Sequence, residues 1–318
     1  MNQRSTPAGS IAVGVDGSAC AGLALDWASE EATRRKLPLH IVHAFSYQYP
    51  MTSAGMGFVI EGVRGIAEEL CERAVAHVNT THPGLTVTWD VTTYGAASAL
   101  VDASRLAHTV VVGARGVGAT RGALLGSVST QAASHAHCPV VVIHENQPSP
   151  RANAPVVVGV DGSALSTNAI AYAFDAAATR RVGLTAVHAW WLDYVEGASA
   201  SAIWTVDWEN MAQEENALVA ESLAGWQEKY PDVEITRQST HGHPVDAVVH
   251  QSENACLVVV GSRGRGGFRG LLLGSVSQGV VHRAHCPVAI VRAPRDHRQA
   301  DGVTEERHLP VPPVREQD

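Results

Sequence analysis

Apolar and polar positions follow two different rhythms along the chain. Short runs of β-branched apolar residues predict strands, and longer stretches with apolar residues at helical spacing predict helices. Strands that are apolar at nearly every position are typical of parallel sheets covered by helices on both faces. The alternation predicts an α/β fold with right-handed crossovers and a doubly wound sheet. In the first half, the predicted strands cover residues 11–15, 39–44, 85–91, 109–113 and 140–143, and the predicted helices cover residues 21–35, 61–79, 97–107 and 127–136.

The second half of the chain repeats the first. When the two Asp-Gly-Ser triplets are aligned, residues 11–19 (IAVGVDGSA) match residues 156–164 (VVVGVDGSA). Residues 112–129 (VGARGVGATRGALLGSVS) match residues 260–277 (VGSRGRGGFRGLLLGSVS), and each half then reaches an Ala-His-Cys-Pro-Val block. Because the order of the blocks is the same in both halves, one domain has been duplicated.

A polar, proline-containing segment separates the two copies. It reads ENQPSPRANAP at residues 145–155 and has the composition of a linker. The charged C-terminal segment is poor in large apolar residues, which predicts disorder. The expected organisation is a first domain at residues 9–144, a linker at 145–153, a second domain at 154–293 and a disordered tail at 294–318.

Length and composition exclude several classes of protein. A chain of 318 residues suits two domains, and its 45% apolar content can build their cores. The net charge of −8 argues against nucleic-acid binding, and no apolar run is long enough for a membrane span. The polar N-terminus lacks the apolar segment of a secretory signal. Together with five cysteines that show no C-x-x-C spacing, this predicts reduced thiols and a cytoplasmic location.

A glycine-rich loop follows the fourth predicted strand of each copy. Glycine permits positive φ and lets the backbone approach a phosphate closely. The loop ends where a helix is predicted to start, and free N–H groups there favour an anion. The alternative is a flexible connection whose serine caps the helix. The motif consists of Gly113, Gly116, Gly126, Ser127 and Ser129 in the first copy and of Gly261, Gly264, Gly274, Ser275 and Ser277 in the second.

Two other phosphate-binding motifs do not fit this loop. A Walker A loop requires a lysine that neither Gly126-Ser127 nor Gly274-Ser275 carries. A Rossmann fingerprint belongs to the first strand–helix turn, whereas this loop follows the fourth strand.

The G-x2-G-x9-G-[ST] spacing, with an aspartate closing the first strand, resembles the ATP-binding branch of the universal stress protein family. The resemblance covers both copies and is greatest to the tandem-domain proteins of actinobacteria, including mycobacteria. It implies in each domain a five-stranded parallel sheet of Rossmann-like type, similar to adenine-nucleotide alpha-hydrolases. It also implies that ATP lies across the carboxyl ends of strands one and four. Two ATP molecules per chain, with Mg²⁺, are therefore expected.

The resemblance also assigns roles to residues of this chain. The glycines and the first serine of each loop would wrap the phosphates, and the chain near Ala44 and Ala189 would meet the adenine through backbone groups. Asp193 is a further candidate for contact with the ribose. The expected ligand-binding residues of the first domain are Gly14, Asp16, Ala44, Gly113, Gly116, Val117, Gly118, Arg121, Gly122, Gly126, Ser127, Val128 and Ser129. Those of the second domain are Gly159, Asp161, Ala189, Asp193, Gly261, Gly264, Arg265, Gly266, Arg269, Gly270, Gly274, Ser275, Val276 and Ser277.

Two pairs of polar residues have alternative interpretations. Asp16 and Asp161 follow an apolar strand and precede Gly-Ser, so each is a candidate ribose or Mg²⁺ ligand. Each also suits an Asx-type turn before the next helix. His43 and His188 lie near the end of the second predicted strand, where a buried, hydrogen-bonded histidine is the favoured interpretation over a catalytic or pH-sensing one.

The expected function is that of an ATP-binding regulator or sensor in the stress response. The alternatives are a weak ATPase or phosphoryl-transfer enzyme, for which no evident general base stands beside the loop, and a nucleotide-independent interaction module. The final strands of the copies, at residues 140–143 and 288–291, are candidate edges for pairing of the two domains. Whole chains are expected to form a homodimer, and an unidentified protein partner is left open.

Overall fold

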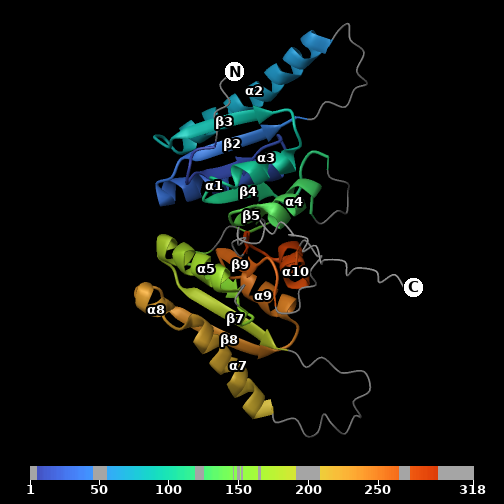
Figure 1. Ribbon diagram of the computed structural model, residues 1–318. Coiled ribbons are helices and arrows are strands. Elements are labelled where there is room, and N and C mark those ends of the chain that lie inside the picture. Colours follow the sequence, from blue (N-terminus) through green and yellow to red (C-terminus); the bar gives the residue numbers. More distant parts are fainter. Residues whose placement is uncertain are drawn as a thin grey trace, which may run out of the picture.

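The computed structural model describes residues 6–45, 56–118, 125–145, 147–148, 151, 153–163, 166–190, 208–264 and 273–292, with the backbone alone at residues 56–61 and 208. Figure 1 shows the first domain above the second. The tail at 294–318 and residues 191–207, which include Asp193, lie outside the described residues.

The first domain alternates strands and helices in the expected order. Its elements are β1 (Ile11–Gly14), α1 (Ala19–Arg35), β2 (Leu39–Ala44), α2 (Met56–Thr81), β3 (Val87–Thr92), α3 (Ala96–Ala103), β4 (Thr109–Gly113), α4 (Ser127–His135) and β5 (Val140–Ile143).

The second domain repeats this order, and its described residues include the additional short helix α8. Its elements are β6 (Val156–Gly159), α5 (Ser166–Arg180), β7 (Leu184–Trp190), α7 (Trp208–Leu223), α8 (Trp226–Lys229), β8 (Ile235–His241), α9 (Pro244–Ser252), β9 (Leu257–Gly261), α10 (Ser275–Arg283) and β10 (Val288–Val291).

All ten strands form one sheet, in the order β3-β2-β1-β4-β5-β10-β9-β6-β7-β8. Neighbouring strands within each domain are parallel, so the prediction of two doubly wound α/β domains is confirmed. The strand order reverses between β1 and β4, and between β6 and β9, which is where such sheets bind ligands. β5 and β10 pair antiparallel, with Val141 opposite Ala289. The expected pairing of the domains through their final strands is therefore also confirmed.

Helices cover both faces of the sheet. Residues of α1, α2, α5 and α7 form one apolar cluster that continues across both domains. Residues of α3, α4, α9 and α10 form a second cluster on the opposite face. Figure 1 shows α1 and α5 on one side of the central strands and α4 and α10 on the other. Among the described helices, none combines the length and the apolar character that a membrane span requires.

Several helix boundaries differ from the sequence prediction. α1 begins at Ala19 rather than at 21, because the Ser18 hydroxyl accepts a hydrogen bond from the Ala21 N–H and caps the helix. α2 begins at Met56 rather than at 61. α3 ends at Ala103 rather than at 107, because Ser104 caps it and its hydroxyl donates to the Val101 carbonyl.

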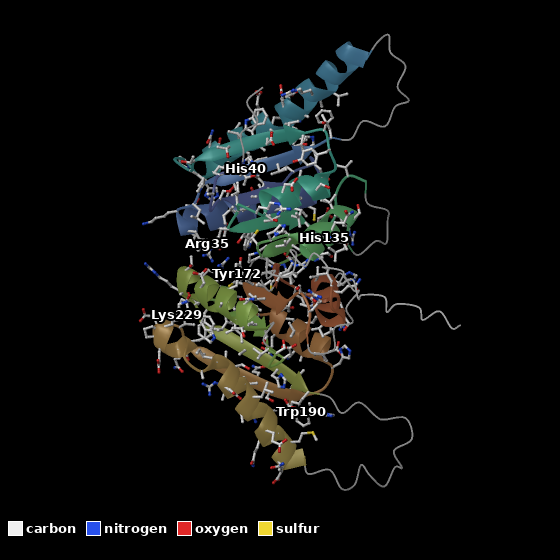
Figure 2. The ribbon with its side chains drawn as sticks, in the orientation of Figure 1. Arg35, His40, His135, Tyr172, Trp190 and Lys229 are labelled. Carbon is white, nitrogen blue, oxygen red and sulfur yellow. The ribbon has the colours of Figure 1, made fainter. Side chains whose placement is uncertain are left out.

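A buried ionic cluster joins the two domains where α1 meets α5. Glu31 of α1 is fully buried and accepts hydrogen bonds from Arg35 of its own helix and from Arg180 of α5, the latter at 2.6 Å. Arg35 also pairs with Asp175 of α5, at 2.6 Å. Figure 2 shows Arg35 and Tyr172 on facing sides of this seam. Burial would raise the pKa of Glu31, but the charges of Arg180 and Arg35 outweigh burial and hold that pKa below its usual value.

Replacement of Glu31 by glutamine is expected to lower the free energy of unfolding by about 3 kcal/mol at neutral pH, since it leaves the buried Arg180 without a carboxylate and leaves Arg35 with Asp175 alone. Because the folded-state pKa lies below that of the unfolded chain, about 4.3, the stabilisation is present above that pH. It is lost as the pH falls through the folded-state pKa. Urea unfolding at a series of pH values should show this loss in the unmodified protein and a flatter profile in the variant.

Glu69→Gln is the matched control. Glu69 pairs with Arg73 on the surface, and both side chains are 63% exposed, so its replacement should change the unfolding midpoint little. Equal effects of the two substitutions would show that the buried cluster does not stabilise the fold.

Candidate functional site

Each domain has a cleft at the carboxyl ends of its first and fourth strands. The clefts have volumes of about 480 Å³ in the first domain and about 440 Å³ in the second, within the usual range for small-molecule sites, about 300–1,000 Å³. The described residues expected at the first site all line the first cleft, namely Gly14, Asp16, Ala44, Gly113, Gly116, Val117, Gly118, Gly126, Ser127, Val128 and Ser129. Those expected at the second site all line the second cleft, namely Gly159, Asp161, Ala189, Gly261, Gly264, Gly274, Ser275, Val276 and Ser277.

The remaining expected site residues lie outside the described part of the chain. They are Arg121 and Gly122 in the first domain and Asp193, Arg265, Gly266, Arg269 and Gly270 in the second.

The base of each glycine-rich loop is held closed by a single residue. Ala114 donates its N–H to the Ile143 carbonyl of β5 at 2.7 Å, and its own carbonyl accepts from the Gly126 N–H at 2.8 Å. Ser262 makes the equivalent bonds in the second domain. The two ends of the loop are therefore held together directly before α4 or α10.

The aspartate that closes the first strand links this loop to the first helix. Asp16 Oδ1 accepts from the Ser18 N–H at 3.0 Å, and Asp16 Oδ2 accepts from the Val117 N–H of the loop at 2.9 Å. In the second domain, Asp161 Oδ1 accepts from the N–H and the hydroxyl of Ser163. The Asx-type turn is thus present in both domains, and each carboxylate also reaches the cleft.

The loop glycines are required by close approach rather than by positive φ. A Cβ on Gly116 would overlap Asp16 Oδ2, and one on Gly264 would come within 2.7 Å of Asp161 Oδ2. A Cβ on Gly113 would meet the backbone of Cys20 at 2.9 Å, where α1 packs against the end of β4. The freedom of glycine to adopt a positive φ is not used by these three residues. It is used instead by Gly17 and Gly162, which follow the aspartates with φ of 83° and 70°.

The serines after the loop have two different roles. Gly126 and Gly274 are the N-caps, without a side-chain hydrogen bond, so the interpretation of the following serine as the cap is wrong. The buried hydroxyl of Ser129 donates to the Ala114 carbonyl at 3.0 Å and that of Ser277 to the Ser262 carbonyl at 3.1 Å. Ser127 and Ser275 are exposed, and within the described residues their hydroxyls make no hydrogen bond.

The cleft has the electrostatic character of an anion site. The free N–H groups of the first turn of α4 and of α10 border it, and a helix N-terminus carries partial positive charge. The exposed Arg115 and Arg263 add a full charge to each cleft. Next to Arg115, burial lowers the pKa of His144 and the charge of Arg115 lowers it further, which favours the neutral ring.

One carboxylate per cleft could take part in metal binding. Among the described residues, no group of three His, Cys, Asp or Glu side chains could hold a metal ion. Mg²⁺ is commonly held by one or two carboxylates together with substrate phosphates and water. Asp16 and Asp161 fit that arrangement, because each lines a cleft beside the free N–H groups of a helix.

The N-terminal parts of α3 and α9 also line the clefts, and sequence reasoning missed them. Ala96 and Leu100 of α3 line the first cleft, and Pro244 and Val248 of α9 line the second. The signal was available, since both pairs stand four residues apart and occupy matching places in the two copies.

Replacement of Gly116 by alanine is expected to destabilise the protein by about 1–3 kcal/mol, because the added methyl overlaps the Asp16 carboxylate. In an Asp16→Ala background the same replacement should cost far less, and a double-mutant cycle of unfolding free energies measures the difference. Gly118→Ala is the control, since a Cβ there meets no atom within 4 Å. An equal cost of Gly116→Ala in both backgrounds would contradict this explanation.

Comparison with known proteins identifies the family. The model of the universal stress protein family matches residues 8–144 and 153–292. A universal stress protein of Mycobacterium tuberculosis is 40% identical over 291 residues, which cover 89% of this chain and 96% of that protein. A universal stress protein of Mycolicibacterium smegmatis is 41% identical over 299 residues, covering 92% and 99%. The crystal structure of a universal stress protein from Archaeoglobus fulgidus has the same fold, with a TM-score of 0.63 and 19% identity over 89% of this chain and 98% of that one. The chain belongs to the universal stress protein family.

Proposed function

We propose that this protein binds one ATP in each cleft and acts as a nucleotide-dependent regulator in the stress response. The observation that carries the proposal is the repetition of one cleft in both domains. Each cleft lies where the strand order reverses, and each combines a closed glycine loop, a free helix N-terminus and one aspartate. The mycobacterial relatives are named as universal stress proteins, which supports the role in stress.

The lining residues suit the parts of ATP in a consistent order. The N–H groups at the start of α4, with the exposed Ser127, would receive the phosphates. Asp16 would face the ribose or a Mg²⁺ ion held between its carboxylate and the phosphates. The backbone at Ala44 would meet the adenine, beside the apolar side chains of Val42 and Leu100. The second cleft would use Ser275, Asp161, Ala189, Val187 and Val248 in the same way.

Regulation would follow from the two contacts of Asp16. ATP that binds only the folded protein stabilises it by mass action. Since Asp16 bonds both to the loop at Val117 and to the start of α1 at Ser18, a ligand that engages Asp16 acts on both segments. The surface around the cleft would then differ between the free and the bound protein.

Protein that is purified without added nucleotide and then denatured is expected to release ATP, close to two molecules per chain, measured by chromatography and mass spectrometry. Calorimetric titration of nucleotide-free protein with ATP and Mg²⁺ should show two sites. Gly116→Ala and Gly264→Ala should each remove one of them, because the added methyl displaces the aspartate of that cleft. Circular dichroism checks that both variants are folded. Gly65→Ala serves as the control, because Gly65 lies on α2 outside both clefts and a Cβ there meets no atom within 4 Å.

Two results would overturn this proposal in different directions. Release of no nucleotide, with a melting temperature that ATP leaves unchanged, would favour the interaction-module alternative. Conversion of bound ATP to ADP in a single turnover would favour an ATPase.

A further inference from the structure

The histidine near the end of the second strand anchors the residue that precedes the site aspartate. His43 Nδ1 lies 2.7 Å from the Val15 carbonyl oxygen, and His188 Nδ1 lies 2.7 Å from the Val160 carbonyl oxygen. Because a carbonyl only accepts, Nδ1 carries the hydrogen in both rings. Both residues are hydrogen-bonded histidines, as expected from the sequence. His188 is buried, with 4% of its surface exposed, whereas His43 is only partly buried.

With this bond, both the N–H and the carbonyl of the residue before the aspartate are hydrogen-bonded to the second strand, an arrangement that we call the clamp. The Val160 N–H donates to the Val187 carbonyl of β7 at 2.8 Å, and the Val160 carbonyl accepts from His188 at the next position of the same strand. Val15 is held in the same way by Val42 and His43. Since the clamped residue directly precedes the aspartate, its orientation sets the direction in which the carboxylate leaves the strand.

The two domains differ in what holds the histidine itself. His188 Nε2 bonds to Glu215 Oε2 of α7 at 2.7 Å. In the first domain, Ala67 of α2 occupies the position that corresponds to Glu215. The alignment rests on the buried residue four positions later in each helix, which is Cys71 in α2 and Val219 in α7. His43 Nε2 makes no hydrogen bond within the described residues. The second clamp is therefore fixed at both ring nitrogens and the first at one.

The chemistry of the bond between His188 and Glu215 makes it a strong support. With Nδ1–H given to the Val160 carbonyl, a neutral ring offers only an acceptor at Nε2, and an ionised carboxylate is also only an acceptor. The 2.7 Å contact thus requires one additional proton, on Nε2 or on the carboxyl group. Hydrogen bonds that involve an ionised partner are about twice as strong as neutral ones.

We propose that Glu215 is a positioning residue of the second site, which holds His188, and through it Val160 and Asp161, in the geometry that binds ligand. Ala67 gives the first site no such support. The effect on nucleotide affinity rests on the proposed function, whereas the effect on the geometry of residues 157–163 does not. Glu215 does not line the cleft, so it acts only through His188. Figure 2 labels Trp190 at the end of β7, two residues beyond His188, which marks this end of the strand.

The test compares three variants of the full chain. Glu215→Met keeps the approximate size of the side chain but cannot hydrogen-bond to Nε2. Glu215→Gln can donate its amide N–H to Nε2 of a neutral ring and preserves the clamp. Glu214→Met removes the same charge from an exposed neighbouring position of α7 and controls for the charge of the helix.

Amide hydrogen exchange of the peptide over residues 157–163 is the first readout and requires no nucleotide. We expect faster exchange in Glu215→Met and unchanged exchange in the other two variants. The second readout is ATP affinity with Mg²⁺ in a Gly116→Ala background, in which only the second cleft is expected to bind ATP. Glu215→Met should weaken it by about three- to tenfold, as for the loss of one buried hydrogen bond, and glutamine should restore it.

The outcomes separate this inference from the proposed function. Unchanged exchange and unchanged affinity in Glu215→Met would overturn the positioning role, and so would equal losses in the Met and Gln variants. If exchange responds as expected but no variant binds nucleotide, the positioning of Asp161 stands and the proposed function fails.

Discussion

The antiparallel pairing of β5 with β10 is the contact on which the arrangement of the domains depends. Three opposed residue pairs join two strands that are buried along their whole length. Because this pairing continues the sheet from one domain into the other, α1 and α5 come to lie on the same face and share one apolar cluster. The fully buried Glu31 is tolerable only there, where arginines from both helices reach it. Each cleft, by contrast, is lined by residues of its own domain, so the seam positions the clefts without forming them.

The duplicated domains have kept their backbone geometry and changed side chains around it. Both keep the aspartate, the glycine with positive φ that follows it and the closed base of the loop. The glycine is required by its positive φ and the base of the loop is closed by backbone hydrogen bonds, and both constraints allow few substitutions. The differences lie one layer further from the cleft, as with Glu215 opposite His188 where the first domain has Ala67. Such a layer can diverge without changing the fold, and so can give two similar clefts unequal properties.

Much of this fold could be predicted from the sequence, because duplication gives two readings of each pattern. The buried strands around Val111 and Val259 are uniformly apolar, and that pattern fixed both the parallel sheet and the place of the loop. The reason for Gly116 could not be predicted, since the atom it avoids belongs to Asp16, 100 residues earlier in the chain. The partners of Glu31 were equally hidden, because helical spacing locates a charged residue on a face but not the helix that will cover that face. Contacts of this kind depend on how the elements pack, which local sequence does not encode.

The buried carboxylate of Glu31 at the seam has a consequence for the choice of assembly partner. Arg35 and Arg180 occupy matching places at the ends of α1 and α5, but the counterpart of Glu31 in the second domain is Ala176. Two first domains joined in this manner would bury a second carboxylate at the centre, and two second domains would keep Asp175, which is 41% exposed, but would have no buried carboxylate there. Only the unlike pair places one buried acid between the two arginines. The asymmetry favours a chain that closes upon itself over one that exchanges domains with its neighbours and grows into an open polymer.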